Sequence, residues 1–293
     1  MKAIETKQLT KYYGKSRGII GVDLSVEQGE RFGFIGPNGA GKSTTIRTLL
    51  GLISPTSGSA SVFGKDIVRD KTAILREVGY LPSEALFYTG MRVKDILKLS
   101  ADLRRADCAK EAKDLCERLQ LDTTKKIEEL SFGNRKKVAI VCALQSEARL
   151  LILDEPTGGL DPLMQHEFYE ILKERNEAGA TIFLSSHILS EVQRVCTRAA
   201  LIKEGRIIAC DSVEALGRSR AKRVVIRGSA DLDGLSGIKD LKSEADSVSF
   251  LYDGAMDLLL HRLAEGGITD LNVSDPDLEE IFLHYYEKDG ERA

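Results

Sequence analysis

Short apolar runs and helical periodicities alternate along most of this chain. Strand-like runs occupy residues 3–9, 22–26, 31–35, 59–63, 150–153, 181–184, 201–202 and 206–209. Between several of them, apolar residues recur at i, i+3, i+4 and i+7, the spacing of a helix with one buried face. Such helices are predicted around Ile46, around 112–119 and around 164–172. Strands that alternate with amphipathic helices predict an α/β fold with a mostly parallel sheet. The first runs are hairpin-like and predict an additional antiparallel piece.

The composition changes to small and charged residues around 211–223, and we place a domain boundary near residue 220. Beyond it, strand patterns at 223–226, 247–252 and 269–273 accompany helical patterns at 256–263 and 278–285. We therefore predict a large domain of residues 1–220, with a helical subdomain at about 84–147, and a small α+β accessory domain of residues 221–293. An appendage of roughly 70 residues is near the lower limit for independent stability.

Composition and charge argue against nucleic-acid binding, a zinc site and a membrane-spanning segment. The 293 residues carry a net charge of −3, which gives no overall basic field for nucleic acid, so we predict no nucleic-acid partner. The short basic run 135–137 is interpreted as a solvated helix face. Five cysteines without zinc-ligand spacing favour free thiols in a reducing cytosol. No apolar run approaches the roughly 20 residues that cross a bilayer, so any membrane contact is expected through a partner.

A phosphate-binding loop follows the strand-like run 31–35. Residues 36–44 read G-P-N-G-A-G-K-S-T, which matches G-x-x-x-x-G-K-[ST]. Its glycines let backbone N–H groups turn inward, and the next helix adds its positive N-terminal end, so the loop suits the phosphates of ATP. Lys42 is expected to reach the β- and γ-phosphates, and Ser43 to bind Mg²⁺. The candidate ATP-binding residues here are Gly36, Pro37, Asn38, Gly39, Ala40, Gly41, Lys42, Ser43 and Thr44.

Two carboxylates end the aliphatic run 150–153. Asp154 and Glu155 fall at the C-terminal end of a strand that is predicted to be buried, where α/β sheets bind their ligands. We expect Asp154 to hold Mg²⁺ through water. We expect Glu155 to orient and deprotonate the attacking water.

A segment upstream of this acidic strand connects the sequence to a known family. Residues 130–135 read L-S-F-G-N-R and resemble the LSGGQ signature of the nucleotide-binding subunits of ABC transporters. The resemblance implies that this segment opens a helix and caps the γ-phosphate bound by the phosphate loop of a second subunit. The signature residues carried over are Ser131, Gly133 and Asn134.

Three further features follow the same family pattern. Residues 157–162 are similar to the D-loop, which implies that Asp161 helps to join two subunits. His187 ends the strand-like run 181–184 and its two serines, like the switch histidine that contacts the γ-phosphate. Tyr13 stands where an aromatic ring stacks on adenine.

One position departs from the family. Residues 79–84 align with the Q-loop, but Ser83 replaces the glutamine that usually touches Mg²⁺ and water. We hypothesise that Ser83 or Glu84 still passes the nucleotide state to a membrane partner. We interpret the following stretch, 85–103, as helical. The resemblance implies that it contributes to the surface that receives the permease, and we expect Phe87, Tyr88 and Met91 to face the partner.

The end of the chain suggests a subgroup. Residues 275–283 look like the close of the C-terminal extension on ATPases of the ABC-2 export group, including drug and antibiotic exporters. The resemblance therefore implies a cytoplasmic ATPase at the inner face of the membrane, acting as a homodimer or heterodimer on a separate transmembrane permease with ATP and Mg²⁺. A soluble ABC ATPase without a transport role, of the assembly-scaffold type, remains the alternative.

Overall fold

The computed structural model describes residues 1–88, 90–217, 222–232, 234–244 and 246–274. Its chain divides into two compact units, Met1–Val213 and Glu214–Ala293. The boundary placed near residue 220, the helix predicted at 278–285 and the family-like ending at 275–283 lie outside the described residues.

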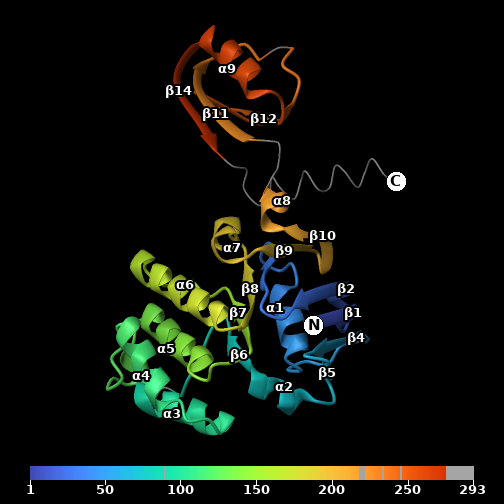
Figure 1. The fold of residues 1–293 in the computed structure, drawn as a ribbon. Coiled ribbons are helices and arrows are strands. Elements are labelled where there is room, and N and C mark those ends of the chain that lie inside the picture. Colours follow the sequence, from blue (N-terminus) through green and yellow to red (C-terminus); the bar gives the residue numbers. More distant parts are fainter. Residues whose placement is uncertain (89, 218–221, 233, 245, 275–293) are drawn as a thin grey trace. The chain divides into compact units, whose positions relative to one another are not determined.

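The larger unit is built on a six-stranded sheet in the order β10-β9-β3-β8-β7-β6 (Figure 1). All neighbouring strands are parallel except β10, which pairs antiparallel with β9. The strand bounds are β3 Arg31–Ile35, β6 Val78–Leu81, β7 Leu150–Asp154, β8 Thr181–Ser186, β9 Arg198–Lys203 and β10 Arg206–Ser212. The predicted mostly parallel sheet is confirmed.

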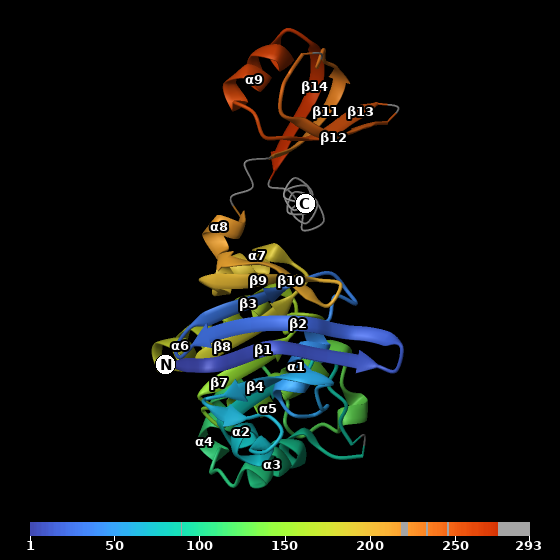
Figure 2. The same ribbon diagram turned by 90° about the vertical axis from the view of Figure 1, so that its right-hand side faces the viewer.

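A second sheet of four antiparallel strands, in the order β2-β1-β4-β5, provides the predicted antiparallel piece. Its strands are β1 Lys2–Tyr13, β2 Ser16–Glu27, β4 Ser57–Val62 and β5 Lys65–Asp66. Figure 2 shows the long β1–β2 hairpin crossing one face of this unit, with β4 beside it.

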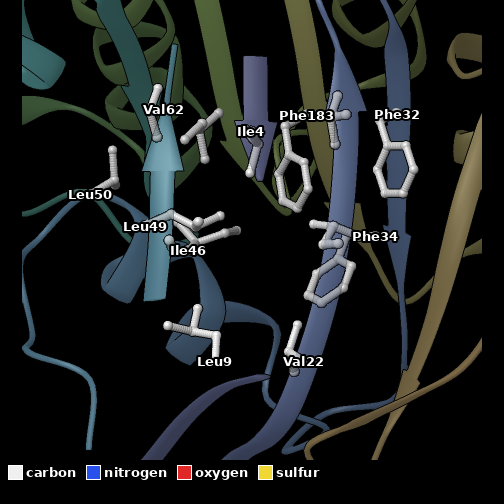
Figure 3. Close-up of a cluster of buried hydrophobic side chains, with 14 of the residues drawn as sticks. Ile4, Leu9, Val22, Phe32, Phe34, Ile46, Leu49, Leu50, Val62 and Phe183 are labelled. Carbon is white, nitrogen blue, oxygen red and sulfur yellow. The ribbon is translucent and has the colours of Figure 1, made fainter. Parts of the chain in front are cut away.

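The hydrophobic core of the larger unit lies between the two sheets and helix α1 (Figure 3). Phe34 of β3 and Phe183 of β8 pack ring to ring at 5.4 Å between centroids, and both are fully buried. Aliphatic side chains from β1, β2, β4 and α1 close around them. Burial of Phe32 and Phe34 in this core holds one face of β3, the strand that leads into the phosphate loop.

Helices cover the six-stranded sheet, and α3, α4 and α5 form a separate group at one side of the unit (Figure 1). The helix bounds are α1 Lys42–Leu49, α2 Lys71–Glu77, α3 Val93–Arg104, α4 Ala109–Arg118, α5 Phe132–Leu144, α6 Pro162–Glu177 and α7 Leu189–Val195, with a 3₁₀ turn at Ile127–Glu129. Helix α8, Val213–Gly217, begins at the last residue of this unit. The periodicities around Ile46, 112–119 and 164–172 thus fall on helices.

The helix predicted over 85–103 is wrong in its first half, because α3 begins only at Val93. The backbone N–H groups of Val93 and Lys94 donate to the carbonyls of Lys125 and Thr123, and Arg92 pairs with Lys126 in a β-bridge. Backbone groups that an earlier helical turn would use are therefore bound to another segment.

The described part of the smaller unit contains a four-stranded antiparallel sheet in the order β12-β13-β11-β14, with helix α9 packed against it. The elements are β11 Lys222–Ser229, β12 Ile238–Ser243, β13 Ser247–Tyr252, α9 Met256–Ala264 and β14 Gly267–Ser274. Val224, Ile226, Phe250 and Tyr252 of the sheet pack with Leu259 and Leu263 of α9. This unit has an α+β composition and a core of its own.

Candidate functional site

The phosphate loop connects β3 to α1 and encloses the side chain of Lys42. The Lys42 side chain is only 5% exposed, and its ammonium donates to the carbonyls of Gly36 at 2.7 Å and Pro37 at 3.2 Å. Gly41, the N-cap of α1, has φ of 111°, which glycine adopts easily. A Cβ on Gly36 would lie 2.3 Å from the Ile202 carbonyl oxygen. The loop therefore requires both glycines for its shape.

Lys42 meets two other predicted residues at this edge of the sheet. Its Nζ lies 3.2 Å from Oε1 of Glu155, and Nδ1 of His187 lies 3.3 Å from the same oxygen. Glu155 follows β7, while His187 follows β8, and the two strands are neighbours. The structure thus assembles the cation, the carboxylate and the imidazole that the sequence placed far apart.

The backbone of Glu155 is held in an unusual conformation. Its φ is 46°, in the left-handed region that residues other than glycine rarely occupy. The Glu155 N–H donates to the Ser185 carbonyl at 3.1 Å, and its carbonyl accepts from Lys136 Nζ at 2.9 Å. Contacts on both sides of the residue therefore offset the strain and aim its carboxylate at Lys42.

Asp154 has a buried carboxylate, one oxygen of which can still accept a hydrogen bond or bind a cation. It is 1% exposed, and one of its oxygens accepts from the Ser185 hydroxyl. Within the described part of the chain, its Oδ2 has no hydrogen-bond partner. A buried carboxylate oxygen without a partner is costly unless a cation or bound water meets it. The residue therefore fits the predicted Mg²⁺ site, to which α1 would contribute Ser43.

Lys136 corrects the interpretation of residues 135–137 as a solvated helix face. The side chain is 3% exposed and donates to three backbone carbonyls: those of Pro82, Ser83 and Glu155. Burial lowers the pKa of Lys136 to about 8, partly offset by the nearby Asp154 and Glu155 carboxylates. A run of three basic residues gives no indication of which one is buried, because that depends on the rotation of α5.

The signature segment lies at the N-terminus of α5. Ser131 is the N-cap, and its hydroxyl accepts from the Asn134 N–H at 3.3 Å. A Cβ on Gly133 would lie 2.4 Å from the Gly159 carbonyl oxygen, so the signature helix rests closely on the predicted D-loop. No hydrogen bond among the described residues joins this segment to the phosphate loop. Asp161 caps α6 by accepting from Met164 N–H at 3.0 Å.

A side-chain network that the sequence did not reveal joins Thr157, in the predicted D-loop, to Ser186, the residue before His187. Glu191 of α7 accepts from the hydroxyls of Thr157 and Ser186, the latter at 2.6 Å. Ser186 in turn accepts from the Ile188 N–H at 2.9 Å. These bonds fix the backbone on either side of His187. Only the i, i+5 spacing of Ser186 and Glu191 hinted at this contact.

Tyr13 lies at the end of β1 beside the phosphate loop. A Cβ on Gly18 would lie 3.1 Å from the Tyr13 ring and 3.0 Å from Thr44, so the three residues are close neighbours. About half of the Tyr13 side chain is exposed. An aromatic surface is therefore available near the N-terminus of α1.

Ser83 follows β6, and its carbonyl faces Lys136. Downstream of it, Leu86 is 93% exposed and Tyr88 is 72% exposed. Two large side chains are therefore well exposed on an irregular segment between β6 and α3. Among the described helices, none is both long and apolar enough to span a membrane.

Known proteins resemble this chain in sequence and in fold. Residues 19–158 match the ABC transporter family. The chain is 33% identical over 297 residues to the bacitracin transport ATP-binding protein BcrA of Bacillus licheniformis, with 96% of each chain covered. It is 30% identical over 303 residues to the linearmycin resistance ATP-binding protein LnrL of Bacillus subtilis strain 168, covering 96% of this chain and 97% of that relative. A solved ATP binding subunit of an ABC transporter superimposes with a TM-score of 0.70 at 32% identity, covering 74% of this chain and 92% of its own.

Proposed function

Because the chain belongs to the ABC transporter family, as an ATP-binding and ATP-hydrolysing subunit, we propose that it drives the export of a drug or antibiotic through a separate transmembrane permease. The names of two full-length relatives, one for bacitracin transport and one for linearmycin resistance, support this substrate class. The alternative of an ABC ATPase without a transport role is set aside.

The observation that carries the catalytic proposal is the contact of Glu155 with both Lys42 and His187. In this scheme Lys42 binds the β- and γ-phosphates of ATP. Glu155 accepts the proton of the attacking water, and His187 contacts the γ-phosphate and holds the Glu155 carboxylate in place. Lys42 and the backbone N–H groups of residues 36–44 stabilise the charge that develops on the phosphoryl group.

A magnesium ion would be held by Asp154 and Ser43. Ser83, which stands at the glutamine position of the Q-loop pattern, would contribute through a water molecule. When bound, it would neutralise the charge of the phosphate oxygens. The unpartnered Oδ2 of Asp154 supports this assignment.

ATP-binding subunits of this family dimerise and act with permeases. We propose that two copies of this chain, or one copy and a related ATPase, bind two ATP molecules between them. Ser131, Gly133 and Asn134 of one subunit then face the phosphate loop of the other, and Asp161 lies at the subunit junction. In this proposal the permease contacts the segment around Leu86 and Tyr88, whose exposure supports the assignment, and the chain acts at the inner face of the cell membrane.

The dimer is tested by ATPase activity of the purified chain over a wide range of protein concentration. We expect activity per chain to rise with concentration, since each site needs signature residues from a second subunit. Size-exclusion chromatography in MgATP should show the same transition. Constant activity per chain from a species that stays monomeric would contradict the composite site.

The Ser83 segment yields a separate prediction about coupling. In the complex with its permease, Ser83→Ala and Glu84→Ala are expected to lower transport more than ATPase activity. The reason is that these side chains link the nucleotide site to the permease-facing segment. Transport into membrane vesicles and ATPase activity are measured together, with the exposed Glu128→Ala as the control. If both variants keep both activities, these side chains do not transmit the signal.

A further inference from the structure

Lys136 holds together three segments that belong to different parts of the larger unit. It lies on α5, just over one turn from the N-cap Ser131. Its ammonium donates to Pro82 O at 3.2 Å, to Ser83 O at 3.0 Å and to Glu155 O at 2.9 Å. An ammonium has three protons, so these backbone carbonyls take up its full donor capacity.

Burial of a cation at this depth is unfavourable unless the structure compensates for it. Here the compensation comes from the three carbonyls and from the neighbouring Asp154 and Glu155 carboxylates. A merely apolar contact at this position of α5 would fill the same space without the desolvation cost. The Lys136 charge is therefore best explained by its hydrogen bonds to these backbone carbonyls.

Both of the accepting segments, Pro82–Ser83 and Glu155, have functional positions. The Glu155 carbonyl belongs to the residue with left-handed backbone, whose carboxylate contacts Lys42 and His187. The carbonyls of Pro82 and Ser83 begin the segment that ends in the exposed Leu86 and Tyr88. A shift of α5 would therefore move both the Glu155 carboxylate and the exposed segment that contains Leu86 and Tyr88.

We propose that Lys136 is a positioning residue: its ammonium fixes the backbone of Glu155 for hydrolysis and ties it to the Pro82–Ser83 backbone, so that α5 moves the two together. The inference rests on the proposed role of Glu155. It assigns no contact of Lys136 with the nucleotide itself.

The test compares Lys136→Met, which keeps length without charge, with Lys136→Arg, which keeps the charge. Lys137→Met, the same change one position along α5, is the matched control. For Lys136→Met we expect kcat for ATP to fall about 10- to 100-fold, as is typical when support of a functional group is removed, with KM unchanged. Lys136→Arg should recover a large part of kcat, and Lys137→Met should leave it unchanged.

Hydrogen–deuterium exchange provides a readout that does not need hydrolysis. In Lys136→Met we expect faster exchange in peptides that cover 83–92 and 155–160, with the rest of the larger unit unchanged. Loss of protection throughout the unit, or an unchanged kcat and exchange pattern, would overturn the proposal. If wild-type protein hydrolyses no ATP while the two peptides still respond selectively, the positioning role holds and the assignment of Glu155 as the base fails.

Discussion

Replacing Glu155 by glutamine is expected to reduce ATP hydrolysis by about 10²- to 10⁴-fold while leaving ATP binding intact. The amide preserves the size of the side chain but cannot accept the proton of the attacking water. It also removes the negative charge that lies 3.2 Å from Lys42 Nζ and 3.3 Å from His187 Nδ1. Binding survives because the phosphate contacts come from Lys42 and the backbone of the loop.

A second consequence follows from the proposed dimer. When hydrolysis is blocked, bound MgATP should hold two subunits together, so Glu155→Gln should elute as a dimer in MgATP and as a monomer without it. Single-turnover hydrolysis and size-exclusion chromatography measure the two effects. The control is Glu128→Gln, because Glu128 is exposed on the 3₁₀ turn and pairs there with Lys126. Activity of Glu155→Gln close to that of wild type would mean that another group acts as the base.

The sequence predicts the local elements of this site well, because each depends on a short pattern. The apolar strand before Gly36 and the glycine spacing after it specify the phosphate loop without any long-range information. Likewise, four aliphatic residues before Asp154 are sufficient to predict a buried strand whose carboxylates emerge at the ligand-binding edge. The sequence does not predict the contact between Glu155 and His187, because it does not show that β7 and β8 are neighbours.

Contacts that depend on helix rotation or on competition for backbone groups are missed. The sequence indicates solvated side chains throughout residues 135–137, because neighbouring basic residues look alike, yet the rotation of α5 buries Lys136 fully. The start of α3 was set too early, since residues 85–92 look compatible with a helix until segment 123–126 binds the N–H groups of Val93 and Lys94. The carboxylate of Glu191 joins Thr157, which follows β7, to Ser186 at the end of β8, and the sequence alone does not show that these strands are neighbours.

Replacing Lys42 by methionine is expected to weaken ATP binding about 10- to 100-fold, the effect of losing one charge-assisted contact to phosphate. Hydrolysis should fall further, by at least about 10²-fold at saturating ATP, because the lost cation also faces charge that grows in the transition state. The structure adds a reason within the protein itself. Lys42 now donates to Gly36 O and Pro37 O, so its removal leaves loop carbonyls and the Glu155 carboxylate without their cation.

The loss of phosphate binding and the loss of the contacts within the loop can be separated by thermal unfolding with and without MgATP. A ligand that binds the folded state raises the unfolding temperature, so wild type should gain stability with MgATP and Lys42→Met should gain much less at the same concentration. Lys173→Met, an exposed change on α6, should behave as wild type. Without nucleotide, Lys42→Met should unfold at a slightly lower temperature than this control, because of the loop carbonyls it leaves unpaired. If MgATP stabilises Lys42→Met as much as wild type, the ammonium does not bind the phosphates and only shapes the loop.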